Sequence, residues 1–126
     1  MSSKIVLVAR ILLGIILVVF GANKFVEFLP PLALDPNGGA AAFFGALAKT
    51  GYMIPLIGLV EVVAGLLLVT KKFVPFALVL LAPISVNIVA FHAALDPANI
   101  APALAVAILN VFLIYKHWDS YRPLFV

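Results

Sequence analysis

The sequence predicts an all-α integral membrane protein, a four-helix bundle with a short interfacial or re-entrant helix between its first two spans. Of 126 residues, 66% are hydrophobic and 10% are charged, with a mean hydropathy of +1.28. Soluble domains have about 45–50% apolar and about 25% charged residues. The apolar residues also form four segments long enough to cross a hydrocarbon core of about 30 Å. We expect a single transmembrane domain over residues 1–126.

The first predicted span covers residues 4–28. A secretory signal peptide is the competing interpretation, but Arg10 interrupts the apolar stretch and no small-x-small cleavage site follows it. We therefore expect a tilted transmembrane helix. After a loop rich in proline and glycine, residues 40–49 (AAAFFGALAK) have a helical apolar pattern. Ten residues rise only about 15 Å, too little to cross, which predicts an interfacial or re-entrant helix.

The remaining predicted spans cover residues 52–70, 73–95 and 97–115. Pro55 lies in the first turn of the second span, where proline is tolerated because that turn has no helical partner for its N–H. Pro83 lies inside the third span, where it removes a helical hydrogen bond and is expected to kink the helix.

The basic residues predict how the bundle is oriented. The net charge of +3 comes from lysines and arginines at the ends of apolar segments, which is typical of membrane topology and not of nucleic-acid binding. By the positive-inside rule, both termini and the second loop are expected on the cytoplasmic side. That side carries Lys4, Lys71, Lys72, Lys116 and Arg122.

Several classes of chemistry have no support in the sequence. The chain has no cysteine, which excludes disulfides, thiol redox chemistry and cysteine-ligated metals. His92 and His117 are predicted at opposite faces of the membrane, so they cannot hold one haem between them. No cluster of histidines and carboxylates predicts a metal site, and no nucleotide-binding or triad motif is present.

Glu61 lies near the centre of the second span, where an ionised carboxylate must be paired, hydrated or neutralised. Small and polar residues recur at spacings of three and four in the first, second and fourth spans, which indicates inward-facing stripes. Helical rise places Arg10 about 9 Å, Glu61 about 15 Å and Asn110 about 9 Å from the cytoplasmic boundary. We therefore predict an Arg10–Glu61 pair with Asn110 beside it.

Six residues are candidates for binding a ligand or carrying a proton, and each also has a structural interpretation. Glu61 and Arg10 would otherwise lock helix packing or, for Arg10, extend to the surface. The asparagines would form interhelical hydrogen bonds. Lys24 would pair with Glu27 at the outer interface, and His92 would be a capping or interfacial histidine there. The six are Glu61, Arg10, Asn87, Asn110, Lys24 and His92.

Three motifs, in this order along the chain, resemble the DoxX family of small four-helix bacterial membrane proteins. The first is RILLGIILVVFGANKF at residues 10–25. The second is IGLVEVVAGLLLV at residues 57–69, which is similar to the family's Gly-x-x-Glu-x-x-x-Gly signature. The third is VNIVAFHAALDP at residues 86–97.

The resemblance implies a bacterial inner-membrane protein that is associated with an oxidoreductase. The family is named for subunits of a quinone-reducing thiosulfate oxidation system, and other members belong to membrane oxidoreductase complexes. We therefore expect an accessory subunit of a redox system, with a quinone as ligand and a redox protein or a second copy as partner. The alternative is a scaffold, an assembly chaperone, or a carrier of small solutes or lipids. Whether the chain is an enzyme stays open.

Overall fold

The computed structural model describes residues 3–126, which form helices and no strand. Four segments are long and apolar enough to cross a membrane: α1, α3, α4, and the 3-10 turn η1 together with α5. The predicted all-α, four-span fold is therefore confirmed. The elements are α1 (Ser3–Asn23), α2 (Gly39–Lys49), α3 (Met53–Thr70), α4 (Val74–Leu95), η1 (Pro97–Asn99), α5 (Ile100–Lys116), α6 (Trp118–Tyr121) and η2 (Arg122–Phe125).

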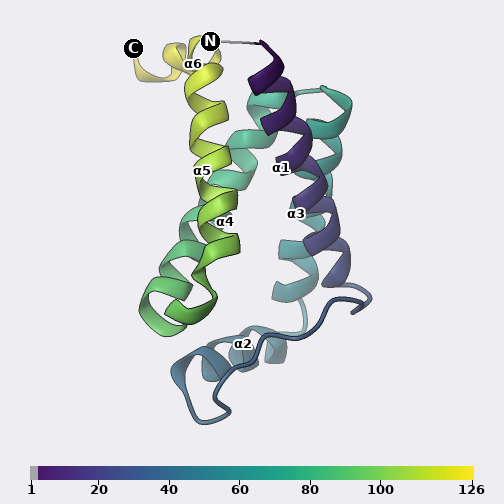
Figure 1. The fold of residues 1–126 in the computed structure, drawn as a ribbon, viewed down its shortest axis with the longest axis vertical. Helices are drawn as coiled ribbons and strands as arrows, with labels where there is room; N and C mark the ends of the chain where they lie inside the picture. The colour runs from purple at the N-terminus through teal and green to yellow at the C-terminus, as the bar shows by residue number, and fades with distance from the viewer. Residues whose placement is uncertain (1–2) are drawn as a thin grey trace.

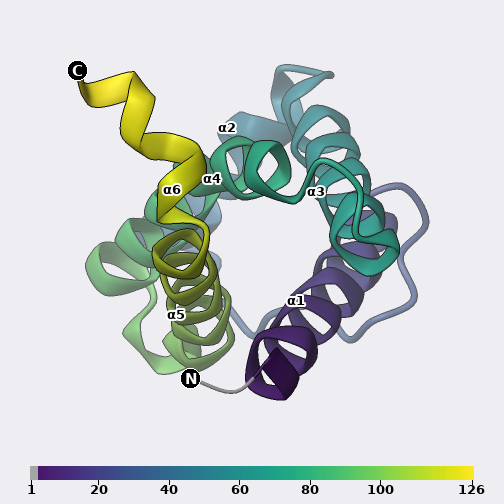
Figure 2. The same ribbon diagram turned by 90° about the horizontal axis from the view of Figure 1, so that it is seen from above.

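The four long helices stand side by side in the cyclic order α1, α3, α4, α5 (Figure 2). One end of the bundle, here called the terminal end, holds the start of α1 and the α3–α4 turn (Figure 1). It also holds the C-terminal segment, residues 117–126, which contains α6 and η2. The short helix α2 lies across the opposite end, here called the α2 end. Between the two ends, leucines fill the core; the fully buried ones are Leu13, Leu17, Leu68, Leu78, Leu81 and Leu113.

The closest helix contact is that of α1 with α3, and glycines make it possible. A Cβ atom on Gly14 would lie 2.9 Å from the carbonyl oxygen of Gly65, and one on Gly21 would lie 2.8 Å from that of Gly58. Backbone therefore meets backbone at two levels, seven residues apart on each helix. Small residues allow this approach in lipid, where dispersion and not water exclusion holds helices together.

Two helix ends differ from the prediction. α1 ends at Asn23 and not at residue 28, because the Asn23 side-chain oxygen accepts the backbone N–H groups of Phe28 and Leu29, at 2.8 and 2.9 Å. Such side-chain bonds compete with helical ones and end the helix. The fourth span begins with a 3-10 turn at Pro97–Asn99, and its α-helix starts only at Ile100.

The short helix α2 is held against α4 by an aromatic cluster. The rings of Phe43 and Phe44 lie 5.1 and 4.9 Å from the ring of Phe91, which is buried on α4. α2 crosses the end of the bundle and does not dip between the long helices, an arrangement that fits the interfacial interpretation (Figure 1).

The glycine contact predicts a specific loss of stability. Replacing Gly65 with alanine puts a Cβ 2.7 Å from the Gly14 carbonyl oxygen, so the backbones must separate. We expect Gly65→Ala to cost about 1–3 kcal/mol, the usual range for overpacking. Gly45→Ala is the matched control, because nothing lies within 4 Å of the added Cβ on α2. Thermal unfolding in detergent measures both, and equal midpoints would refute the close contact.

Candidate functional site

An ion pair joins Lys24, the residue that follows α1, to Glu61 on α3. Lys24 Nζ lies 2.6 Å from Glu61 Oε1, with side-chain exposures of 25% and 4% respectively. Glu61 Oε1 is inaccessible and makes no hydrogen bond beyond this contact. Lys24 Nζ also lies 3.4 Å from the carbonyl oxygen of Phe20. The carboxylate is thus enclosed, whereas the ammonium keeps partial access to the surroundings of the bundle.

The glycine contact brings the two charges together. Its register places Lys24 about six residues, or about 9 Å, from Glu61 along the helix axis. A Cβ on Gly58 would lie 2.9 Å from Lys24 Cβ, so the missing side chain leaves room for the lysine to pass along α3. Glu61 leans toward the N-terminus of α3, which is the direction from which Lys24 comes.

The predicted Arg10–Glu61 pair is wrong. The Arg10 guanidinium instead donates to the backbone carbonyls of Leu68 and, at 3.3 Å, Val69. These carbonyls lie in the last turn of α3, where helical carbonyls lack partners and the helix dipole is negative. Arg10 is buried, and these carbonyls give its guanidinium hydrogen-bond acceptors within the bundle. The predicted Lys24–Glu27 pair is also replaced, since Lys24 pairs with Glu61.

The depth of each residue along its helix predicted the wrong partner for Glu61. The spacing of the glycines in the sequence is a better guide to that partner. Gly14 and Gly21 are separated by seven residues, as are Gly58 and Gly65. Matching these glycines in antiparallel order sets Arg10 opposite the end of α3, as observed. The same register leaves Lys24 as the cation that can reach inward to Glu61.

The two asparagines behave differently. Asn110 is buried and donates from α5 to the Leu78 carbonyl on α4 at 3.1 Å, as expected of an interhelical hydrogen bond. Asn87 is exposed and donates to the Pro83 carbonyl of its own helix at 2.8 Å. Its predicted bond to another helix is wrong, because its side chain faces away from the core. Neither asparagine lies in the Lys24–Glu61 ion pair.

His92 forms a separate polar group at the α2 end. Its Nδ1 atom lies 3.2 Å from Asp96 Oδ2 and 3.3 Å from the Asp96 carbonyl oxygen, and both residues are buried. The Asn99 amide donates to both Asp96 carboxylate oxygens, at 3.0 and 2.9 Å. These bonds tie the end of α4 to the start of the fourth span, which fits the capping role expected of His92.

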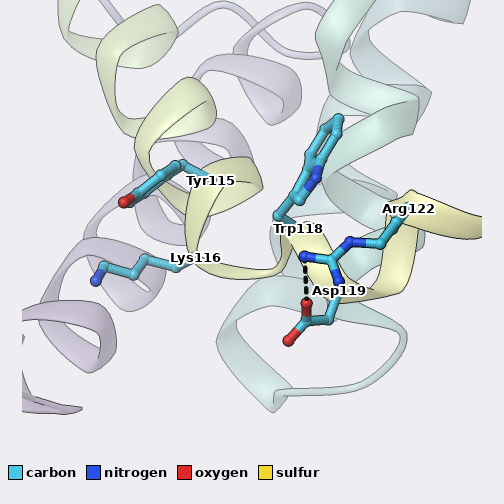
Figure 3. A pocket seen from close by; sticks show the side chains of 5 residues that line it. All are labelled: Tyr115, Lys116, Trp118, Asp119 and Arg122. Atoms are coloured by element: carbon cyan, nitrogen blue, oxygen red, sulfur yellow. Dashed lines mark ion pairs between the residues drawn. The ribbon is translucent and has the colours of Figure 1, made fainter. Parts of the chain in front are cut away.

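The surface of the described residues includes two hollows that lie away from the ion pair. One lies on the outer side of α5, lined by Ala107, Ile108, Val111 and Phe112. The other lies at the terminal end, between the last turn of α5 and the C-terminal segment (Figure 3). Across residues 3–126, no group of three or more histidine, aspartate or glutamate side chains is arranged to hold a metal ion.

The fold and site define a multi-pass α-helical membrane protein in which Lys24 and Glu61 form an ion pair between the first two spans. The chain belongs to the DoxX family, whose model matches residues 5–94, from α1 to the last turn of α4. The fourth span lies outside the match. None of the curated proteins or solved structures compared with the chain matches it.

The ion pair makes a prediction that a double-mutant cycle tests. Breaking one side of a buried pair costs about 3–5 kcal/mol in soluble proteins. Because Lys24 is a quarter exposed, we expect Lys24→Met and Glu61→Gln each to fall at or below the lower end of that range. The double variant should recover part of the loss, since neither charge is then left alone.

Unfolding in detergent gives the four free energies, and Glu27→Gln is the matched control for loss of an exposed carboxylate. Strictly additive losses from the two single substitutions would show that Lys24 and Glu61 do not interact.

Proposed function

We propose that the chain is an accessory membrane subunit of a redox system and that Lys24 and Glu61 bind a quinone-class ligand. The observation that carries this proposal is the buried ion pair, because ionisable groups inside a membrane are costly and usually functional. Membership of the DoxX family supports a membrane role and leaves the ligand to experiment.

The chemistry of the pair suits an apolar ligand with carbonyl groups. A quinone presents two carbonyl oxygens, and the Lys24 ammonium can donate a hydrogen bond to one of them. Reduction of a quinone to a quinol takes up two electrons and two protons. We assign the two electrons to a partner protein. Both protons would come from water, and Glu61, which lies within contact of Lys24, would take up and pass on one proton at a time. The ligand would take the place of the contact between the two side chains.

Lipid extraction of protein purified gently from its own membrane tests the proposal. We expect about one molecule of quinone per protein chain, detected by chromatography and by native mass spectrometry. Glu61→Gln and Lys24→Gln should each lower that ratio severalfold, because each removes a charge from the pair. Glu27→Gln should retain it, because that carboxylate is exposed and outside the pair. Wild-type protein that carries only phospholipid would reject a quinone site.

A second candidate function is a scaffold or assembly chaperone that binds a partner helix or a second copy of the chain. The observation in its favour is that Arg10 and Asn110 are engaged with backbone carbonyls of neighbouring helices, as packing residues would be. A stable second polypeptide in the same mass spectrum, with no quinone, would favour this function.

We also propose a location: the bacterial inner membrane, with the terminal end in the cytoplasm. The exposed Lys71 and Lys72 lie at that end, together with Lys116 at the end of α5 and Arg122 of the C-terminal segment. Positively charged loops are retained on the cytoplasmic side.

Single cysteines can test this orientation, because the chain has none of its own. We expect a membrane-impermeant maleimide added to intact spheroplasts to label Asn37→Cys, which lies in the exposed loop before α2. Lys72→Cys, exposed in the α3–α4 turn, should be labelled only after lysis. The reverse pattern would invert the proposed topology.

A further inference from the structure

We propose that the hollow at the terminal end binds the phosphodiester headgroup of an anionic phospholipid. Figure 3 shows Trp118, Asp119 and Arg122 on one side of this hollow and Tyr115 and Lys116 on the other, with the ends of the Tyr115 and Lys116 side chains directed away from Arg122. The site lies on α5 and the C-terminal segment, apart from Lys24 and Glu61. It stands on its own observations, whatever ligand the ion pair binds.

The backbone on one side of the hollow is held in place because the C-terminal segment is anchored to the bundle. Tyr121 is buried, and its hydroxyl donates a 2.6 Å hydrogen bond to the carbonyl oxygen of Pro75 at the start of α4. Burial raises the pKa of Tyr121, so the hydroxyl keeps its proton and remains a donor at neutral pH. The anchor holds α6 against the end of α5, and the hollow lies between them.

The surrounding side chains place the hollow at the level of lipid headgroups. Lys116 is the last residue of the membrane-spanning helix α5. The rings of Trp118 and Phe125 are stacked, with their centres 5.4 Å apart. Both residues are substantially exposed, as is Leu124. Exposed aromatic and aliphatic side chains next to basic ones are typical of segments that lie in the membrane interface.

The charges of the hollow favour an anion. Lys116 and Arg122 both line the hollow and carry two positive charges, against one negative charge from Asp119. The Lys116 ammonium lies 5.5 Å from the centre of the Tyr115 ring, at the edge of the hollow away from Arg122. Asp119 lies 3.3 Å from the Arg122 guanidinium, but both side chains are mostly exposed, and such pairs are weak. A guanidinium has five N–H donors, so Arg122 can contact a phosphate while Asp119 remains nearby. The exposed Lys71 and Lys72 at the same end add to the positive field.

Trp118 provides the measurement, because it is the only tryptophan of the chain and it lines the hollow. The full-length protein is placed in phosphatidylcholine vesicles that contain an equal mole fraction of either brominated phosphatidylglycerol or brominated phosphatidylcholine. Bromine quenches tryptophan fluorescence only at short range. We expect brominated phosphatidylglycerol to quench Trp118 more strongly, which reports its enrichment at the hollow.

Variants separate a site from diffuse attraction. Lys116→Gln and Arg122→Gln should each lower the preference for phosphatidylglycerol by about fivefold, the factor for one cation at a membrane surface. Asp119→Asn should raise the preference, because it removes the competing carboxylate. Lys72→Gln is the matched control, since it removes a charge at the same end but outside the hollow. It should change the preference much less than Lys116→Gln does.

Three results would overturn the proposal. One is equal quenching of the wild type by the two brominated lipids. Another is a loss in Lys72→Gln as large as that in Lys116→Gln, which would indicate attraction to the whole surface. The third is a preference that inorganic phosphate abolishes while chloride of equal ionic strength does not. That result would assign the hollow to free phosphate.

Discussion

The close approach of α1 and α3 is the constraint on which the rest of the structure depends. Gly14 meets Gly65 and Gly21 meets Gly58, so the two helices share a single antiparallel register. Arg10 and Lys24 lie on either side of Gly14 and Gly21 in the sequence. Arg10 contacts the last turn of α3, and Lys24 contacts Glu61, which lies between Gly58 and Gly65. Any side chain larger than hydrogen at the four glycines would separate the backbones and disturb both charged contacts together.

The membrane spans were predictable because the bilayer imposes a simple length and polarity requirement on each helix. The interfacial helix was predictable for the same reason, since residues 40–49 are apolar but too few to cross. The exact ends were not, because they depend on local hydrogen bonds such as those from Phe28 and Leu29 to the side chain of Asn23. The periodicity of apolar residues does not show where a side chain competes with the helix for backbone hydrogen bonds.

The site was predicted only in part. Glu61 was correctly expected to need a partner, but depth along a helix does not say which cation reaches it. The answer required the register between two helices, because Lys24 starts about 9 Å away along the axis and extends past Gly58. Asn87 shows a related limit: its polarity suggested an inward position, yet its amide bonds back to its own helix.

The two charged contacts between α1 and α3 differ in a way that bears on function. Arg10 donates to backbone carbonyls in the last turn of α3, where carbonyls lack their regular helical N–H partners. Its contact therefore satisfies acceptors that every helix end offers. Glu61 has no such need, because the middle of α3 already forms its own hydrogen bonds. A leucine there would pack without requiring any partner. The chain instead holds a carboxylate whose cation is partly accessible, which is the arrangement that the proposed ligand-binding role requires.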